Sequence, residues 1–164
     1  MITQGINLFI VDDNKLLVTD LKHHLQTRFG VSVNVSVFYD GESCLKKVDK
    51  DTHIVILDYF LDGKNGLEIL KLIKEKNPET EVIMLSSNED IVLAIETFRS
   101  GAKDYVVKGH GSWKKISKLV EYIITAPIRL LVREFGVSKF MAIFLLTFLS
   151  MAAVVLLVMY NMPT

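Results

Sequence analysis

The sequence predicts an α/β fold of five alternating strand and helix units, (βα)5, arranged as a doubly wound parallel sheet. Five short apolar runs alternate with segments whose apolar residues recur at helical spacing. Most of these runs are apolar on both faces, which is typical of parallel strands covered by helices on each side. Right-handed crossovers between parallel strands leave few topologies for such a chain.

The five expected strands differ in their patterns. The second alternates valine with polar residues at a period of two, whereas the other four are apolar almost throughout. In chain order, the expected strands are residues 7–11, 31–37, 53–57, 82–85 and 105–107.

Start and stop signals mark the helices between these strands. A start is a polar side chain that can bond the free N–H groups of a first turn, and a stop is a glycine or a proline. From the second helix to the fifth, the starts are Asp40, Asn65 with Glu68, Ser87 with Asp90, and Ser112. The stops are Gly30 for the first helix, Gly101 for the fourth, and Pro127, near which the fifth is expected to end.

Charge divides the chain into two parts. All 19 basic and all 19 acidic residues lie within residues 1–139, and none lies within 140–164. Residues 1–126 hold the complete (βα)5 pattern, so we expect one domain there. Residues 140–160 are long and apolar enough to predict a C-terminal transmembrane helix, with 127–139 as a juxtamembrane segment. The alternative is a buried core or dimerisation helix.

Basic residues precede the apolar segment and no charged residue follows it. The positive-inside rule then predicts a membrane-anchored protein whose domain faces the cytoplasm. The net charge of zero gives no general attraction to nucleic acid, and no nucleic-acid partner is expected. Cys44 is the single cysteine, which excludes an intramolecular disulfide and a cysteine-based zinc site.

Polar side chains stand where four of the strands end. Asp12 and Asp13 follow the first strand, and Asp58, Ser86 and Lys108 follow the third, fourth and fifth. Ligands of such sheets bind at the carboxyl ends of the strands. Three carboxylates there suit Mg²⁺, and a carboxylate beside Mg²⁺ can attack a phosphoryl group while a lysine neutralises its charge. Each residue alone is commonly a cap or loop residue, so the prediction depends on their joint occurrence.

Residues 5–125 resemble a response-regulator receiver domain of the CheY-like family, found in two-component systems. The segments that carry the resemblance are Ile10-Val-Asp-Asp-Asn14, Ile56-Leu-Asp-Tyr-Phe-Leu61 with Gly66, Met84-Leu-Ser-Ser87 and Gly101-Ala-Lys-Asp-Tyr-Val-Val-Lys108. The resemblance implies a flavodoxin-like sheet with strand order 2-1-3-4-5. It also implies a signalling switch, which is no enzyme beyond catalysing its own phosphotransfer and autodephosphorylation.

The resemblance further implies roles for single residues. Asp58 would be the phospho-acceptor, with Lys108 and Ser86 assisting, and Ser86 and Tyr105 would form the switch. Mg²⁺ would be held by Asp12, Asp13, Asp58 and the backbone carbonyl of Phe60. The phosphoryl group would come from a sensor histidine kinase, a phosphotransfer protein or a small phosphodonor. The signal would leave through the face made by the fourth helix, fifth strand and fifth helix, by binding a partner or by forming a homodimer.

The sequence departs from the family pattern at two loop positions. Gly109 stands where proline usually follows the lysine, so we expect a trans peptide bond there. Asp62 also replaces a common proline, which concerns loop shape rather than chemistry. The resemblance also implies that Phe60 and Asn88, each two residues after a site residue, flank the path of the water that attacks the acyl phosphate, and these residue types predict slow hydrolysis.

Two alternatives remain. A phosphohydrolase of the haloacid-dehalogenase type also uses an aspartyl nucleophile, but it needs Asp-X-Asp on the nucleophile strand, and Tyr59 and Phe60 follow Asp58 here. A degenerate receiver could act as a constitutive scaffold, although the complete set of five site residues argues against it. An acyl phosphate on Asp58 would separate the three.

Overall fold

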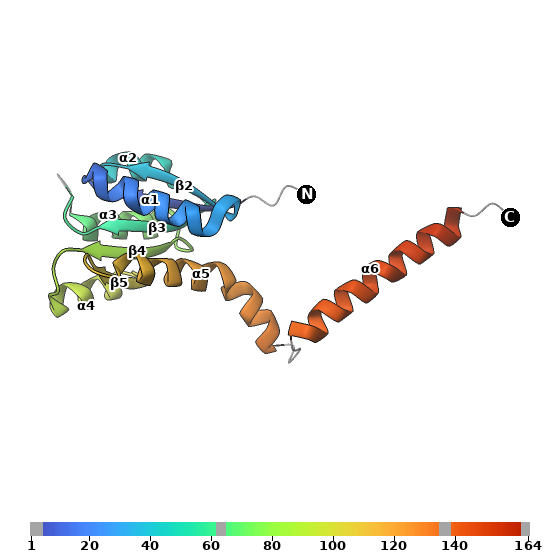
Figure 1. The fold of residues 1–164 in the computed structure, drawn as a ribbon. Helices are drawn as coiled ribbons and strands as arrows, with labels where there is room; N and C mark the ends of the chain where they lie inside the picture. Colours follow the sequence, from blue (N-terminus) through green and yellow to red (C-terminus); the bar gives the residue numbers. More distant parts are fainter. Residues whose placement is uncertain (1–4, 62–64, 135–138, 162–164) are drawn as a thin grey trace. The chain divides into compact units, whose positions relative to one another are not determined.

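The computed structural model describes residues 5–61, 65–134 and 139–161. The chain divides into two compact units, residues 1–123 and 124–164, and each is treated by itself. The first unit is built on a five-stranded parallel sheet in the order β2-β1-β3-β4-β5 (Figure 1). The predicted flavodoxin-like α/β fold is therefore confirmed.

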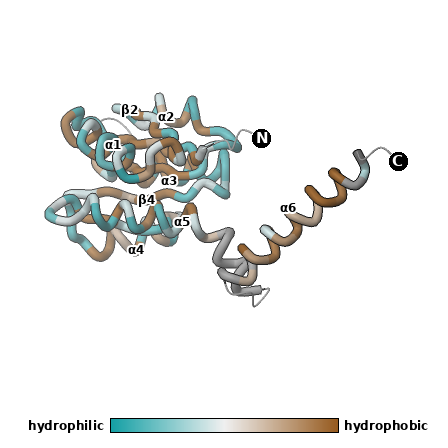
Figure 2. The backbone as a smooth tube through the Cα atoms, turned by 45° about the vertical axis from the view of Figure 1, so that its right-hand side comes forward, coloured by the Kyte–Doolittle hydropathy of each residue, from teal (hydrophilic) through white to brown (hydrophobic). Residues whose placement is uncertain are grey.

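Each predicted strand agrees with the structure to within two residues at either end. The strands are β1 Ile6–Val11, β2 Val33–Phe38, β3 Thr52–Asp58, β4 Glu81–Ser86 and β5 Asp104–Val107. Strands β3 and β4 are buried along almost their whole length, because helices cover both faces of the sheet. Figure 2 shows β4 coloured as hydrophobic along the middle of this unit.

Most predicted helix starts are confirmed as caps. The helices are α1 Lys15–Phe29, α2 Gly41–Lys47, α3 Gly66–Lys76, α4 Ile91–Arg99, α5 Ser112–Glu134 and α6 Lys139–Asn161, with a short 3-10 helix η1 Gly30–Ser32. Asp40, Asn65 and Asp90 accept backbone N–H groups at the starts of α2, α3 and α4. Ser112 instead lies inside α5, and its hydroxyl donates to the Gly109 carbonyl over 2.8 Å.

The helices form a layer on each face of the sheet. On one face α1 and α5 lie together, joined by a 2.8 Å hydrogen bond between His24 Nε2 and Ser117 Oγ and by a 2.8 Å ion pair between Arg28 and Glu121. On the other face, buried side chains of α2 and α3 form one cluster with those of the strands, and two residues of α4 pack against it. The sheet is thus held rigidly, and its strand ends keep a fixed spacing.

Helix α5 does not end near Pro127 as predicted, because it continues to Glu134. Proline lacks the N–H that would bond the carbonyl of Ile123, so the helix loses one backbone hydrogen bond there without stopping. The first compact unit ends at Ile123 itself. The expected juxtamembrane segment therefore begins as helix, and residues 135–138 lie outside the described part of the chain.

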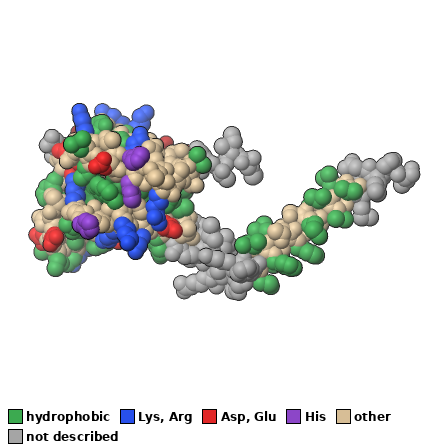
Figure 3. Space-filling view, in the orientation of Figure 1, with side chains coloured by type: hydrophobic (Ala, Val, Ile, Leu, Met, Phe, Trp, Pro, Cys, Tyr) green, Lys and Arg blue, Asp and Glu red, His purple; other side chains and the backbone are tan. Residues whose placement is uncertain are grey.

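The structure does not support the predicted transmembrane helix. The apolar segment is helical, as α6, and most of its described side chains are exposed (Figure 3). A membrane span needs roughly 20 apolar residues within one helix. Within the ranges that the structure describes, no helix has both the length and the apolar content that crossing a bilayer requires. The prediction of a membrane-anchored protein with its domain in the cytoplasm is therefore wrong, because the absence of charged residues does not by itself give a helix the apolar content of a span.

Candidate functional site

The strand register brings the predicted site residues to one edge of the sheet. Asp12 follows β1 and its N–H donates to the Phe38 carbonyl of β2 over 3.2 Å. Asp58 and Ser86 are the last residues of β3 and β4. The N–H of Lys108 donates to the Ser86 carbonyl over 2.7 Å, which continues the pairing of β4 with β5. All four residues therefore stand at the carboxyl ends of adjacent strands.

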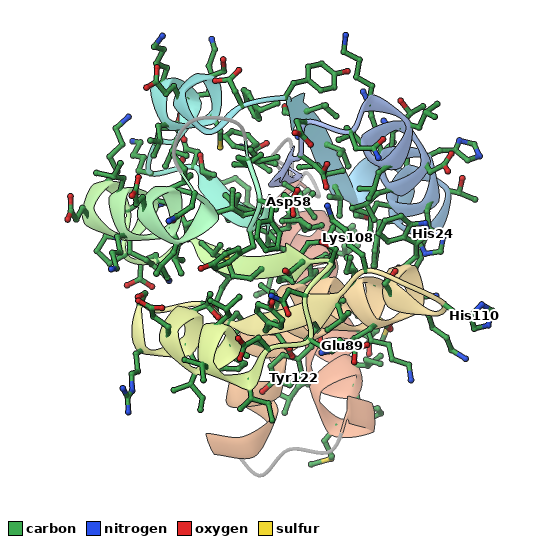
Figure 4. All side chains as sticks on the ribbon, turned by 90° about the vertical axis from the view of Figure 1, so that its left-hand side faces the viewer. His24, Asp58, Glu89, Lys108, His110 and Tyr122 are labelled. Carbon is green, nitrogen blue, oxygen red and sulfur yellow. The ribbon has the colours of Figure 1, made fainter. Side chains whose placement is uncertain are left out.

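Lys108 joins two of the carboxylates. Its Nζ lies 2.8 Å from Asp12 Oδ2 and 2.9 Å from Asp58 Oδ2. The side chains of Asp12 and Asp58 are 1% and 3% exposed, whereas that of Lys108 is 22% exposed. Figure 4 shows Asp58 and Lys108 side by side at this end of the sheet. The two acids are thus buried beneath a lysine that reaches the solvent.

Burial and charge perturb this pair. Burial raises the pKa of Asp58; the bonded Lys108 opposes that rise and the neighbouring Asp12 adds to it. Burial acts to lower the pKa of Lys108, but its bonds to Asp12 and Asp58 outweigh burial and hold that pKa above its ordinary value. At neutral pH the lysine is therefore charged, and it can compensate negative charge that develops on Asp58.

The three predicted acids also come together. One carboxylate oxygen from each of Asp12, Asp13 and Asp58 lies within 4.8 Å of the others, with Asp13 exposed to solvent. Asp12 Oδ2 and Asp58 Oδ1 accept no hydrogen bond of good geometry within the described part of the chain, although the first lies in the ion pair with Lys108. A buried carboxylate oxygen without a partner is costly. Oxygen-only ligands of this kind fit Mg²⁺.

Asn14 orients Asp12, a role that the sequence interpretation missed. The N–H of Asn14 donates to Asp12 Oδ1 over 2.9 Å. The side chain of Asn14 in turn caps α1 by accepting from Leu16 and Leu17. An asparagine directly after the acid pair and before a helical pattern is the signal that could have revealed this cap.

Asn88 connects the Ser86 hydroxyl to Tyr105. The N–H of Asn88 donates to Ser86 Oγ over 3.1 Å, and its carbonyl accepts from the Tyr105 hydroxyl over 2.8 Å. The Tyr105 side chain is buried, with only 8% of the residue exposed. The sequence does not indicate that the backbone of Asn88 links these two side chains, so this connection is visible only in the structure.

The loops around the site have distinctive geometry. No cis peptide bond occurs in the described residues, so the expected trans bond before Gly109 is confirmed. Phe60 is 50% exposed, and its ring lies edge-on to that of Tyr59 at 5.0 Å between centroids. A side chain at Gly66 would lie 2.7 Å from the Tyr59 Cα, so glycine allows α3 to begin beside the end of β3. Asp62 lies outside the described residues.

Part of this chain is similar in sequence to known proteins. The model of the response regulator receiver domain family matches residues 8–121. A protein-glutamate methylesterase/protein-glutamine glutaminase of Thermotoga maritima is 35% identical over 115 residues, which cover 68% of this chain and 33% of that protein. The transcriptional regulatory protein CpxR of Escherichia coli K12 is 32% identical over 115 residues, covering 68% of this chain and 47% of that protein. The similarity thus spans less than half the length of these relatives.

Solved structures agree. The BeF3-activated receiver domain of DrrB is 31% identical, with a TM-score of 0.66, and the match covers 73% of this chain and 97% of that one. The response regulator domain of Thermotoga maritima CheB is 30% identical, with a TM-score of 0.62, covering 74% and 96%. The family match and this sheet edge lead to one conclusion: the chain belongs to the response regulator receiver domain family and carries a receiver domain of a two-component response regulator.

Proposed function

We propose that Asp58 is the phospho-acceptor of this receiver domain, which we assign to residues 1–126. The observation that carries the proposal is the environment of one carboxylate. Asp58 is buried, Oδ2 pairs with Lys108, and Oδ1 has no hydrogen-bond partner among the described residues. Mg²⁺ would be held by Asp12, Asp13, Asp58 and the backbone carbonyl of Phe60. Bound there, it would neutralise the negative charge of the phosphoryl group and its donor.

The chemistry is transfer to a carboxylate. An oxygen of Asp58 forms a bond to phosphorus while the bond between phosphorus and the donor atom breaks, and the donor leaves with that electron pair. The product is an acyl phosphate. The ammonium of Lys108 can stabilise the new negative charge, because its Nζ already lies 2.9 Å from Asp58 Oδ2. Hydrolysis by water then removes the phosphoryl group as inorganic phosphate and returns Asp58 to a free carboxylate.

Ser86 and Tyr105 form the switch in this proposal. The Ser86 hydroxyl can bond a phosphoryl oxygen, and its partner at present is the N–H of Asn88. The carbonyl of the same residue holds the Tyr105 hydroxyl. Movement of Ser86 toward the phosphoryl group would therefore shift the backbone of Asn88, whose carbonyl accepts the hydrogen bond of Tyr105. That backbone leads directly into α4, whose N-cap is Asp90.

The partners follow from the family. Receiver domains interact with histidine kinases or phosphotransfer proteins, and we propose that one of these supplies the phosphoryl group here. We further propose that the signal leaves through the face made by α4, β5 and α5, by homodimerisation or by binding another protein. Tyr105 lies on β5 and Asn88 precedes α4, so the switch borders this face.

Chemical trapping tests the proposal. The full chain is incubated with acetyl phosphate and Mg²⁺, and borohydride then reduces any acyl phosphate to an alcohol that survives digestion. Peptide mass spectrometry should locate the reduced residue at position 58. Reduction at another acid, or at none, would contradict the assignment.

A further inference from the structure

Strand β2 lies at one edge of the sheet, with β1 as its one strand neighbour in the described sheet (Figure 1). The carbonyl of its last residue, Phe38, accepts from the Asp12 N–H over 3.2 Å, on the β1 side. Backbone groups of successive strand residues point to opposite sides, so those of Val33, Val35 and Val37 point away from β1. These N–H and C=O groups form a free edge to which a further strand can bond.

The free edge of β2 lacks the features that usually protect a sheet edge, which are charged side chains, proline, bulges and short strands. Residues 29–39, all of which the structure describes, contain no charged residue and no proline. Strand β2 pairs with β1 over six successive residues without a shift in register. Valine, which alternates along β2, has a high preference for strands. The edge is therefore open to pairing.

The opposite edge of the sheet is protected. Strand β5 has only four residues, begins with Asp104 and lies between Lys103 and Lys108. The side chain of Lys115 also covers part of this strand, because its Nζ donates to the Tyr105 carbonyl over 2.8 Å. The open edge is thus a feature of β2 and not of both edges of this sheet.

The sequence of β2 is symmetric about Val35. Residues 33–37 read Val-Asn-Val-Ser-Val, so valine and polar residues alternate in the same way in both directions. Asn34 and Ser36 share one face of the strand and are exposed, whereas the valines share the other face and are buried or half-buried. When β2 is turned end for end about Val35, valines meet valines and Asn34 meets Ser36.

We propose that β2 pairs antiparallel with β2 of a second copy of this chain, about a two-fold axis at Val35. The sheets of the two copies then continue into each other. Val35 lies opposite its own counterpart and Val33 opposite Val37, and each such pair exchanges two backbone hydrogen bonds. This contact is separate from the face made by α4, β5 and α5, because β2 and β5 are opposite edges of the sheet.

Symmetry favours a second copy over another partner. An extended segment of an unrelated protein could also bond the free edge, but it would not require β2 to read alike in both directions. Like charges directly opposite each other destabilise a strand pair, and the uncharged β2 avoids this repulsion when it meets itself. The contact involves one short strand from each copy, so it is small and its occupancy depends on protein concentration.

Cysteine cross-linking of the full chain tests the arrangement. Asn34 and Ser36 of opposite copies form a pair without backbone hydrogen bonds, whose Cα atoms lie about 4.5 Å apart, close enough for a disulfide. Asn34→Cys and Ser36→Cys are oxidised with copper phenanthroline, singly and mixed, and Lys71→Cys at an exposed site on α3 is the matched control. Cys44 is the only native cysteine, and burial raises the pKa of its thiol to about 12, so background oxidation is low.

The antiparallel pair predicts a specific pattern of disulfides. The mixture of Asn34→Cys and Ser36→Cys should form mixed dimers, identified by mass, several-fold faster than either variant or Lys71→Cys forms dimers alone. Equal rates in all samples, as expected if copies associate elsewhere or another protein covers the edge, would overturn the inference. Faster dimerisation of Asn34→Cys alone than of the mixture would also overturn it, because the axis would not lie at Val35.

Two double variants provide a second measurement. Asn34→Lys with Ser36→Lys places lysine opposite lysine across the axis, whereas Asn34→Lys with Ser36→Glu places lysine opposite glutamate. Both change only exposed side chains. Sedimentation velocity over a concentration series should show a several-fold lower dimer fraction for the first variant than for the second. Equal dimer fractions in the two variants would contradict pairing through this edge.

Discussion

Lys108 and Asp58 form an ion pair of 2.9 Å that crosses one strand of the sheet. Asp58 ends β3 and Lys108 follows β5, and β4 lies between those two strands. The lysine therefore reaches over the end of the strand that carries Ser86. This arrangement concentrates an acid, a hydroxyl and a cation in one place, and it has consequences for stability as well as for phosphotransfer.

Replacing Asp58 with asparagine should stabilise the fold at neutral pH. Burial raises the pKa of Asp58 above its value in the unfolded chain, so the ionised carboxylate costs stability wherever both states are ionised. Asp58→Asn removes that cost and should raise the unfolding midpoint by a few degrees in EDTA.

The gain from Asp58→Asn should shrink as the pH falls. As the pH falls through the folded pKa the wild-type carboxyl binds a proton and the penalty shrinks, and below the pKa of the unfolded chain it is gone, so the two proteins should converge at acid pH. Urea unfolding across a pH series measures this. The exposed Asp20→Asn variant in α1 is the control and should show no comparable gain. A constant or growing difference toward acid pH would contradict the assigned direction.

Magnesium should stabilise the protein through the acid cluster. A ligand that binds only the folded state adds about 2.7 kcal/mol at a concentration one hundred times its dissociation constant. The thermal midpoint of wild type should therefore rise with added Mg²⁺ and return with EDTA. Asp13→Ala should lose this response, since it removes one of three clustered carboxylates.

Lys108→Ala separates metal binding from charge compensation. The variant leaves all three acids in place, so it should still respond to Mg²⁺ while transmitting the signal poorly. If Asp13→Ala were stabilised by Mg²⁺ as strongly as wild type, the cluster would not be the metal site.

The Tyr105 hydroxyl should matter for the switch and not for phosphotransfer. Tyr105→Phe keeps the buried ring and removes the 2.8 Å bond to the Asn88 carbonyl. Labelling by acetyl phosphate should be unchanged. Hydrogen exchange of peptides covering residues 86–95 should respond to phosphorylation in wild type and respond less in the variant, with the exposed Tyr39→Phe as control. An equal response in Tyr105→Phe would remove this hydroxyl from the switch.

The acyl phosphate should be long-lived. Phe60 offers no hydrogen-bonding group to orient a water, and its half-exposed ring packs against that of Tyr59, the residue that follows the phospho-acceptor in sequence. Asn88 is a poor base. Decay of the phosphorylated protein in Mg²⁺ should be slower in wild type than in Phe60→Asn or Asn88→Glu. Wild-type decay as fast as that of both variants would show that the ring does not shield the site.

The sequence was sufficient for the sheet and for the residues at its carboxyl edge. Strands buried on both faces have an unmistakable apolar pattern, and parallel pairing then forces Asp12, Asp58, Ser86 and Lys108 to one edge. The ion pairs of Lys108 follow from that placement. Local capping rules were equally successful for Asp40, because a side chain and the N–H groups that it bonds are close in sequence.

Features that depend on tertiary context were not predictable. The link through the Asn88 backbone depends on how β4 and β5 lie relative to each other. Every residue has the same backbone groups, so the sequence does not show which of them accept or donate such bonds. Pro127 was expected to end α5, but a proline removes only one hydrogen bond and the helix continues past it. The apolar C-terminal segment is helical as expected, whereas the inference of a membrane span was wrong.

The most direct test of the account is whether one phosphoryl group appears on Asp58. The full-length wild type and Asp58→Asn are incubated with acetyl phosphate, with Mg²⁺ or with EDTA, and measured by intact-mass spectrometry. The account predicts a mass increase of one phosphoryl group for wild type in Mg²⁺, and none for wild type in EDTA or for Asp58→Asn. Equal labelling of wild type and Asp58→Asn, or no labelling of either, would contradict it.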